Sequence, residues 1–238
     1  MMSQPNEQPF VPRIDTKLRK HIVTIPEEIE RASGFTLWGR RIRSLIFSTD
    51  IAIIRNCNAD AVLAVYPFTP QPIISNAIIS SSSLPVFCGV GGGTTTGHRV
   101  AMLAQDAEAL GAMGVVVNAP TTNEVIRMMH DVIDIPIIIT VLNEKTDIQA
   151  RLDAGAIILN VSAAAKTPEV VAHIRKQFPQ VPIIAPGGPT TESIRRTIDA
   201  GANAISFTPP TAMELFHGLM SHYRQEAIRA EDLPIIEE

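Results

Sequence analysis

Short apolar runs alternate with amphipathic stretches along most of the chain, from about residue 44 onward. Three of the runs begin with an apolar residue followed by proline: "LPVFCGV" at 84–90, "IPIIITV" at 135–141 and "VPIIAPGG" at 181–188. Proline is tolerated at the first position of a strand but not in its middle, so each run predicts the start of a β-strand. Because the runs are almost wholly apolar, we expect parallel strands that are covered on both faces.

A second pattern closes a helix and opens the next strand, as in "ARLDAGAIILNVS" at 150–162 and "TIDAGANAISFTP" at 197–209. Glycine after the last helical turn supplies the left-handed cap. Gly155 and Gly201 are 46 residues apart, as are Pro136 and Pro182. The repeating unit is therefore a pair of strand–helix modules.

Extending this rhythm backward gives eight strands separated by helical stretches such as 121–133 and 167–178. Eight strands in strict alternation with helices predict an α/β fold, a (βα)8 TIM barrel; an open doubly wound sheet is the alternative. We favour the barrel because the length fits closure and no long crossover is visible. The predicted strands cover residues 44–50, 60–67, 84–89, 114–118, 136–141, 156–161, 181–186 and 203–207.

Two terminal segments lie outside the repeat, so we divide the chain into an extension (1–40), the barrel (41–224) and a tail (225–238). The stretch "TIPEEIERASG" at 24–34 has a threonine cap, early acidic residues and a closing glycine, which predict a helix. We expect this helical extension to plug the bottom of the barrel or to meet a partner subunit in a homodimer. The segment after Tyr223 predicts an extra helix.

Composition and charge limit the classes of partner that the protein is expected to bind. The net charge is −4 and no block of Lys or Arg occurs, so a nucleic-acid partner is not expected. The apolar runs are far shorter than the ~20 residues of a membrane span, and the N-terminus lacks a signal-peptide pattern, which predicts a cytoplasmic protein with no membrane partner. Cys57 and Cys88 are too few for a disulfide framework. For Cys88 we favour a buried thiol over a nucleophile.

Active sites of TIM barrels lie at the carboxyl ends of the strands, and that rule selects the candidates. For proton transfer these are Asp50, Glu144 and His98, with Asn160 as a fourth catalytic candidate. Asp50 has a second interpretation as a helix cap, and His98 as a solvent-facing residue. The neutral candidates for hydrogen bonds to a substrate are Asn118, Thr140, Ser206 and Thr208.

The stretch "CGVGGGTTTGHR" at 88–99 follows the third predicted strand. Consecutive glycine amides before a threonine-capped helix, expected to begin near Thr96, make a concavity for negative charge. We therefore predict an anion site or lid here, with a mobile surface connection as the alternative. Its predicted anion-binding residues are Gly91, Gly92, Gly93 and Arg99.

Residues 151–210 resemble the second half of phosphate-binding TIM barrels, both the ribulose-phosphate-binding, epimerase and aldolase group and the inosine-monophosphate dehydrogenase and flavin-linked group. The resemblance implies that Gly187 and Gly188, with Thr191 at the following helix, bind phosphate through backbone N–H groups. The eighth strand departs from the pattern, because Pro209 and Pro210 have no N–H to donate. A simple tight turn is the alternative reading of the glycine pair.

These features predict an enzyme that acts on a small anionic, phosphorylated metabolite by acid–base chemistry, as a lyase, isomerase or hydrolase. The alternatives are a flavin- or nucleotide-dependent enzyme and a non-catalytic barrel that senses a metabolite, as in the glycerol-uptake antiterminator barrels. Imine chemistry is disfavoured because the sixth strand, "AIILNVS", has no lysine. No metal site is predicted and no cofactor is required; Mg²⁺ shared with a substrate phosphate, or FMN, would be compatible.

Overall fold

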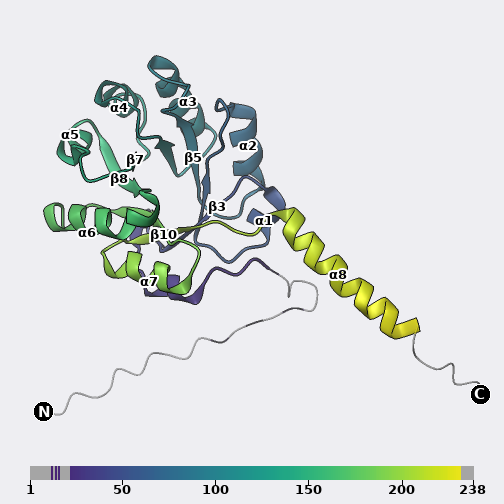
Figure 1. Ribbon diagram of the computed structural model, residues 1–238. Coiled ribbons are helices and arrows are strands. Elements are labelled where there is room, and N and C mark those ends of the chain that lie inside the picture. The colour runs from purple at the N-terminus through teal and green to yellow at the C-terminus, as the bar shows by residue number, and fades with distance from the viewer. Residues whose placement is uncertain (1–11, 13, 15, 17–21, 232–238) are drawn as a thin grey trace, which may run out of the picture.

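The computed structural model describes residues 12, 14, 16 and 22–231. Its centre is a closed barrel of eight parallel strands in the order β10-β3-β4-β5-β6-β7-β8-β9 (Figure 1). The predicted TIM barrel is confirmed, and each strand falls within its predicted range except for the bulged end of β5. The strands are β3 (Ser44–Phe47), β4 (Ala61–Ala64), β5 (Val86–Gly91), β6 (Gly114–Val117), β7 (Ile137–Val141), β8 (Ala156–Val161), β9 (Ile183–Pro186) and β10 (Ala204–Phe207).

Helices follow the strands and ring the barrel (Figure 1). Seven of them alternate with the strands, and a short 3-10 turn precedes the sixth. They are α1 (Ile51–Arg55), α2 (Pro72–Ser81), α3 (His98–Ala109), α4 (Asn123–His130), α5 (Ile148–Asp153), η2 (Ala164–Lys166), α6 (Thr167–Gln177) and α7 (Thr191–Asp199), with α8 (Ala212–Glu231) at the C-terminal side.

Alternate strand residues divide between two apolar layers, because successive side chains of a strand point to opposite faces. One layer packs the strands against the helices and includes Ile139 and Leu159. The other fills the barrel interior. Its buried members are Ile42, Leu45, Ala61, Leu63, Phe87, Val116, Ile138, Ile158, Ile184 and Ala204.

A hairpin of β1 (Phe35–Leu37) and β2 (Arg40–Ile42) closes the amino-terminal end of the strands, which we call the floor. Phe35 packs edge-on against the interior Phe87, with ring centroids 6.5 Å apart. The two-residue turn Trp38-Gly39 has positive φ at both positions, as tight hairpins require. The hairpin, rather than a helix, plugs the barrel.

The helix predicted over 24–34 is wrong. Only the 3-10 turn η1 (Glu27–Arg31) forms, and its N-cap residue Pro26 makes no side-chain capping bond. Ala32 is already extended and Gly34 has φ +72°, so the chain turns into the hairpin before a full helix can develop. The tertiary demand to plug the floor outweighs the local helix signal.

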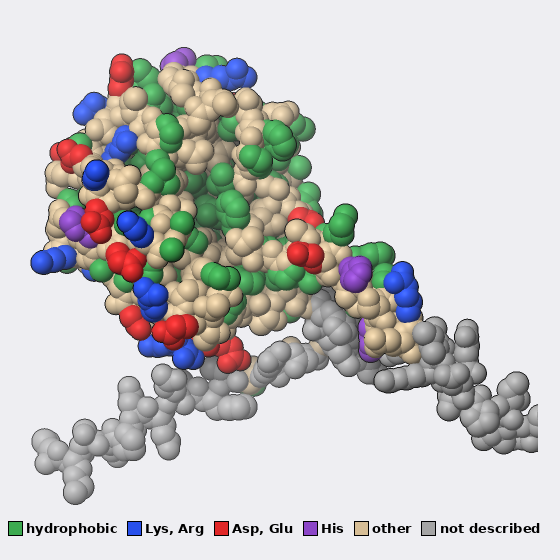
Figure 2. All heavy atoms as spheres, viewed as in Figure 1, with side chains coloured by type: hydrophobic (Ala, Val, Ile, Leu, Met, Phe, Trp, Pro, Cys, Tyr) green, Lys and Arg blue, Asp and Glu red, His purple; other side chains and the backbone are tan. Residues whose placement is uncertain are grey.

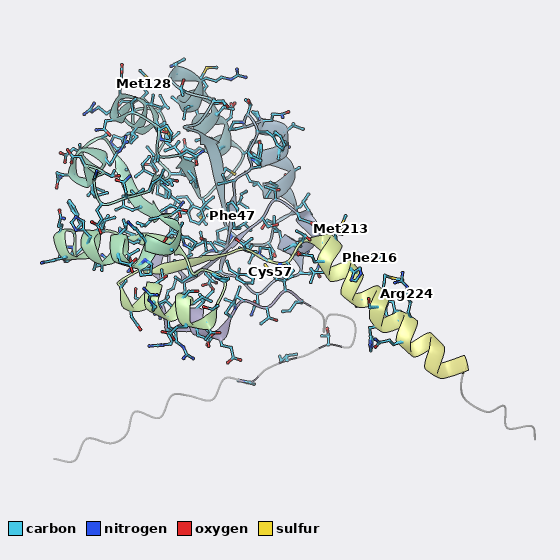
Figure 3. All side chains as sticks on the ribbon, in the orientation of Figure 1. Phe47, Cys57, Met128, Met213, Phe216 and Arg224 are labelled. Atoms are coloured by element: carbon cyan, nitrogen blue, oxygen red, sulfur yellow. The ribbon has the colours of Figure 1, made fainter. Side chains whose placement is uncertain are left out.

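Residues 23–32 cover the barrel between α7 and α1, where an eighth helix would otherwise pack. Ile25 and Ile29 join the apolar cluster of Ile54 and Ile205, and Val23 forms a β-bridge with Cys57. Helix α8 consequently leaves the barrel (Figures 1 and 3). It is one continuous helix that starts well before the extra helix expected after Tyr223.

Among the helices of the described part of the chain, none has the length and apolarity that a membrane span requires. The predicted boundaries at residues 40 and 224 stay predictions. Hairpin and helix run across them without interruption, whereas 1–11 and 232–238 lie outside the described residues.

Candidate functional site

Neutral polar side chains form the last interior layer of the barrel at its carboxyl end, which we call the mouth. Thr140, Asn160 and Ser206 each follow an interior residue by two positions, so strand alternation points them inward. Asn160 Nδ2 lies 3.4 Å from Thr140 Oγ1, a long hydrogen bond between β8 and β7. Phe47 takes the corresponding place on β3 and lies near the middle of the ring in Figure 3. Three predicted residues therefore meet here.

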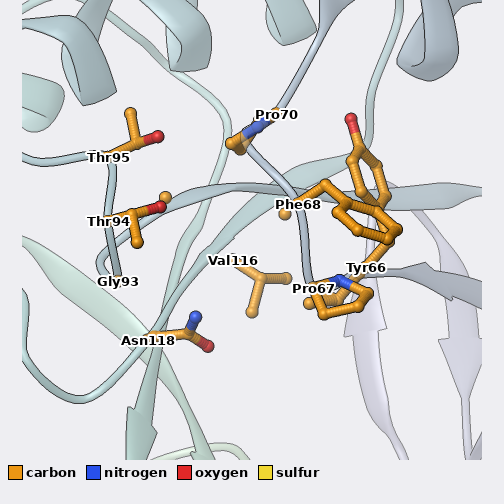
Figure 4. A pocket seen from close by; sticks show the side chains of 12 residues that line it. Tyr66, Pro67, Phe68, Pro70, Gly93, Thr94, Thr95, Val116 and Asn118 are labelled. Atoms are coloured by element: carbon orange, nitrogen blue, oxygen red, sulfur yellow. The ribbon is translucent and has the colours of Figure 1, made fainter.

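One cleft of about 240 Å³ opens beside this layer, over β4, β5 and β6. In Figure 4 the side chains of Tyr66 and Phe68 face the loop Gly93–Thr95 across the cleft, and Asn118 closes the side below that loop. Among the described residues, its lining contains no Lys, Arg, Asp, Glu or His. We call it the glycine-loop cleft.

The glycine loop adds backbone N–H groups to a cleft that is also lined by the polar side chains of Tyr66, Thr94, Thr95 and Asn118. Gly92 N donates to Thr95 O at 2.9 Å, which folds Gly92–Thr95 into a tight turn. Within the described residues, the N–H groups of Gly93 and Thr94 donate to no protein group. Adjacent unpaired N–H groups in a turn favour an anion. A cleft does lie beside the stretch 88–99, and its use as an anion site stays a prediction.

Two details of that prediction are wrong. Helix α3 begins at His98, and its N-cap is Gly97 at φ +63° with no side-chain capping bond, so no threonine caps it. The reason is conformational, since the backbone needs a left-handed residue at the cap and glycine adopts it most easily. His98 and Arg99 are exposed on α3 and do not line the cleft.

A second cleft, of about 460 Å³, lies over β9 and β10 and is lined by Gly187, Gly188, Thr191, Ser206 and Thr208. The structure therefore brings together the glycine pair and three of its predicted neighbours. Its remaining lining residues are apolar or lack charge: Pro26, Pro186, Pro189, Thr190, Ile194, Ile205 and Phe207.

Packing explains this glycine pair as well as phosphate binding does. A Cβ at Gly187 would lie 2.6 Å from Ile194 Cγ1, and one at Gly188 2.6 Å from Ser193 Oγ. A capping box occupies two N–H groups of α7, because Thr190 Oγ1 accepts from Ser193 N and Ser193 Oγ accepts from Thr190 N. Free donors remain here too, because the N–H groups of Gly187, Gly188 and Thr191 donate to no described residue.

The three acid–base candidates do not come together. Asp50 Oδ1 accepts from Ala52 N at 2.8 Å and from Ile53 N at 3.3 Å, so this carboxylate caps α1. Glu144 lines a separate groove between α5 and α6 that also contains His173. With His98 exposed on α3, only Asp50 lies on the loop that directly follows the interior Phe47.

Charge is scarce around both clefts. On the face shown in Figure 2, acidic and basic side chains gather at the lower left, over α6 and α7, while the middle of the face is apolar or uncharged. No group of three His, Cys, Asp or Glu side chains able to hold a metal occurs in the part of the chain that the structure describes. The donor set at the mouth therefore does not fit a resident Mg²⁺ ion by itself.

Cys88 faces the helices rather than the mouth, in the cluster outside the strands. It is 1% exposed, and burial raises the pKa of its thiol to about 11. A thiolate is the reactive form, so this geometry supports the buried, inert interpretation.

Several residues at the mouth were not among the predicted site residues: Phe47 at the end of β3, and Phe68, Thr94 and Thr95 in the lining of the glycine-loop cleft. Phe47 reaches the mouth because β3 ends there instead of at residue 50, and only the strand register reveals this. Thr94 and Thr95 lie inside the stretch 88–99, where the glycine N–H groups, and not the threonines, indicated the anion site. Arg151, which holds a mouth loop, has no sequence signal because it lies inside an ordinary helix pattern.

No protein-family model and no curated protein matches this chain. Among solved structures it is similar to a putative phosphonomutase from Burkholderia cenocepacia J2315, with TM-score 0.61, 16% identity and coverage of 76% of this chain and 93% of that one. It is also similar to phosphonopyruvate hydrolase in complex with oxalate and Mg++, with TM-score 0.61, 16% identity and coverage of 88% and 91%.

A third similar structure is 2,3-dimethylmalate lyase, described as a PEP mutase/isocitrate lyase superfamily member, with TM-score 0.58, 15% identity and coverage of 89% and 88%. The chain thus spans most of the length of each of these barrels. At 15–16% identity the likeness shows the TIM-barrel fold that the chain shares with them.

Proposed function

We propose that this barrel is an enzyme that acts on a small anionic metabolite carrying a phosphate, phosphonate or carboxylate group. The observation that carries the proposal is the pair of unpaired N–H groups at Gly93 and Thr94, next to an interior layer of neutral hydrogen-bonding side chains. The barrels similar to it are described as mutase, hydrolase and lyase, which supports a substrate of this class.

The two parts of the site have different tasks. The anionic group binds at the glycine loop, where N–H dipoles supply attraction without a cationic side chain. The reacting part of the molecule then extends over Thr140, Asn160 and Ser206, whose hydroxyl and amide groups stabilise charge that develops on a substrate oxygen. Such stabilisation serves a lyase, an isomerase or a hydrolase.

For proton transfer we propose Asp50 ahead of Glu144 and His98, because its loop joins the interior strand β3 to α1. Capping occupies Oδ1, and Oδ2 accepts no hydrogen bond from any described residue. A divalent cation would enter with the substrate, since the described residues contain no group of three His, Cys, Asp or Glu side chains that could hold it.

A non-catalytic, metabolite-sensing barrel is the second candidate. The observation that favours it is the composition of the two clefts, whose described lining contains no carboxylate, imidazole or amine. A sensor needs shape and hydrogen bonds, whereas proton transfer needs a titratable group within reach of the substrate.

Calorimetric titration with inorganic phosphate, oxalate, phosphonopyruvate and phosphoenolpyruvate tests the proposal, and phosphorus NMR follows turnover of the last two. Saturable binding with turnover supports the enzyme. Binding without turnover of either substrate favours the sensor. If none of the four anions binds, both functions are overturned.

We also propose a homodimer, with α8 as its contact. Phe216 on α8 is 64% exposed, and residues 23–32 already fill the place on the barrel where α8 would pack. A second copy offers the same helix, so a two-fold contact would cover both. Sedimentation of Phe216→Glu against Trp38→Glu, whose native side chain is also 64% exposed, tests this. Only the Phe216→Glu variant is expected to be monomeric, and a monomeric wild type would refute the dimer.

The cytoplasmic location of the protein stays a prediction.

A further inference from the structure

Arg151 reaches from α5 to the loop between β6 and α4. Its Nη1 donates to the carbonyl oxygen of Thr121 and, at 2.9 Å, to Asn123 Oδ1, and its Nη2 donates to Ala119 O at 3.3 Å. One guanidinium therefore binds three acceptors within residues 119–123. Its planar fork of donors suits this task in a way that an ammonium does not.

The glycine loop rests on the same segment. Asn118 N donates to Gly91 O at 3.0 Å. A Cβ at Gly92, which has φ +92°, would lie 2.2 Å from Thr121 Oγ1 and 2.6 Å from Asn118 N. The two loops thus touch at backbone distance, and a shift of one must displace the other.

Thr121 is held through its backbone rather than its side chain. It is 3% exposed, and among the described residues its Oγ1 is a buried polar atom with no hydrogen-bond partner. Its N–H donates to Asn118 O at 3.1 Å, and its carbonyl accepts from Arg151. The guanidinium is accordingly the contact that ties Thr121 to α5.

We propose that Arg151 is a positioning residue that fixes the 119–123 loop and, through Gly92, the anion-binding N–H groups of Gly93 and Thr94. This inference rests on the proposed function, since it concerns the same site. Arg151 lines a neighbouring groove with Lys145 and does not line the glycine-loop cleft, so it acts through the loops and not by contact with the ligand.

Arg175 provides a matched control at the opposite end of the barrel. It donates to Gly201 O from both Nε and Nη2, at 3.1 and 2.9 Å, and to Val181 O at 2.8 Å, within the loops of the floor. Partial burial lowers the pKa of both guanidinium groups, with Asp147 opposing that effect at Arg151. The two arginines hold loops at opposite ends, and Arg175 makes six hydrogen bonds where Arg151 makes three.

The experiment compares Arg151→Lys with Arg175→Lys in the full-length chain. Three readouts are the Kd for inorganic phosphate, the thermal midpoint, and amide hydrogen exchange of peptides that cover 88–97. We expect Arg151→Lys to raise the Kd about tenfold and to speed exchange in 88–97, because the loss of one charge-assisted contact corresponds to about that factor. Arg175→Lys is expected to lower the thermal midpoint, with the Kd and the exchange of 88–97 unchanged. In Arg151→Ala, added guanidinium ion should restore part of the phosphate affinity.

A Kd within twofold of wild type for Arg151→Lys, together with unchanged exchange in 88–97, would overturn the inference. A midpoint lowered equally by both variants, with no difference in Kd, would show a structural role only. If the wild type binds no phosphate, the proposed function fails on its own. Hydrogen exchange then still decides whether Arg151 positions the glycine loop, because that readout requires no ligand.

Discussion

The floor and the mouth of this barrel are the two ends of the same eight strands, yet they are held by different interactions. At the floor, aromatic packing of Phe35 on Phe87 seals the interior, and Arg175 ties the loops around it. At the mouth, the turn at Gly92 rests on a loop that Arg151 holds. Arginine hydrogen bonds thus hold loops at both ends, whereas aromatic packing closes only the floor and the mouth stays open for recognition.

The largest loss of stability is expected when an aromatic side chain is removed from the floor. Phe87 is fully buried between hairpin and strands, so Phe87→Ala should lower the free energy of unfolding by about 3–5 kcal/mol through lost burial and a cavity. Urea denaturation measures this change. Phe68→Ala is the matched control, because Phe68 lies at the mouth and is 74% exposed. A similar loss of unfolding free energy in both variants would contradict the view that aromatic packing stabilises the floor and not the mouth.

The next effect is expected at the mouth, from Gly92→Ala. The new methyl group would meet Thr121 Oγ1 and Asn118 N, and φ +92° is itself unfavourable for alanine. We expect a loss of roughly 3 kcal/mol in unfolding free energy together with weaker phosphate binding.

Gly97→Ala is the control for this variant, since Gly97 also has positive φ, at +63°, but a Cβ there would meet nothing within 4 Å. Its expected loss comes from backbone strain alone, about 1–3 kcal/mol, because φ +63° with ψ −149° is a conformation that glycine adopts far more easily than alanine. If the two variants bound phosphate equally, contact between the loops would not matter for recognition.

The same contrast explains what the sequence could predict. Proline-initiated apolar runs such as 135–141 marked the strands, since they reflect local backbone rules that hold anywhere in a chain. The rule that sites lie at the carboxyl ends then placed Thr140, Asn160 and Ser206 correctly at the mouth, although their roles stay predictions.

Contacts between distant segments could not be predicted in this way. The hairpin at 35–42, and not the helix predicted over 24–34, covers the apolar floor of the barrel. Arg151 contacts Thr121, 30 residues away in the chain, only because the fold brings the two together. Propensity and spacing describe neighbours in sequence, whereas these roles depend on neighbours in space.

Cys88 lies in the core between the floor and the mouth, and there alkaline pH should lower the stability of the folded state. Burial raises the pKa of its thiol to about 11 from an ordinary value of 9.0, so the folded state keeps a proton that the unfolded state releases. Stability is unaffected below pH 9.0 and falls as pH rises toward 11.

At about pH 10.5 the wild type should have lost roughly 2 kcal/mol more, relative to neutral pH, than Cys88→Ala has. Urea denaturation at both pH values measures the difference. Cys57→Ala serves as control, because burial also raises the pKa of the Cys57 thiol but that side chain is only half-buried. An identical pH dependence in wild type and Cys88→Ala would place the alkaline transition elsewhere.

The smallest change in stability is expected at Asp50. Its carboxylate caps α1, a structural role, and is also the proposed group for proton transfer. Asparagine caps a helix about as well as aspartate, so Asp50→Asn should leave the unfolding free energy within about 0.5 kcal/mol, whereas Asp50→Ala should cost about 1 kcal/mol. Turnover of phosphoenolpyruvate or phosphonopyruvate separates the tasks. If Asp50 transfers a proton, both variants lose activity to a similar extent although only one loses the cap. Full activity in Asp50→Asn would show that capping α1 is its whole role, and proton transfer would then need a group from outside the described lining of the two clefts.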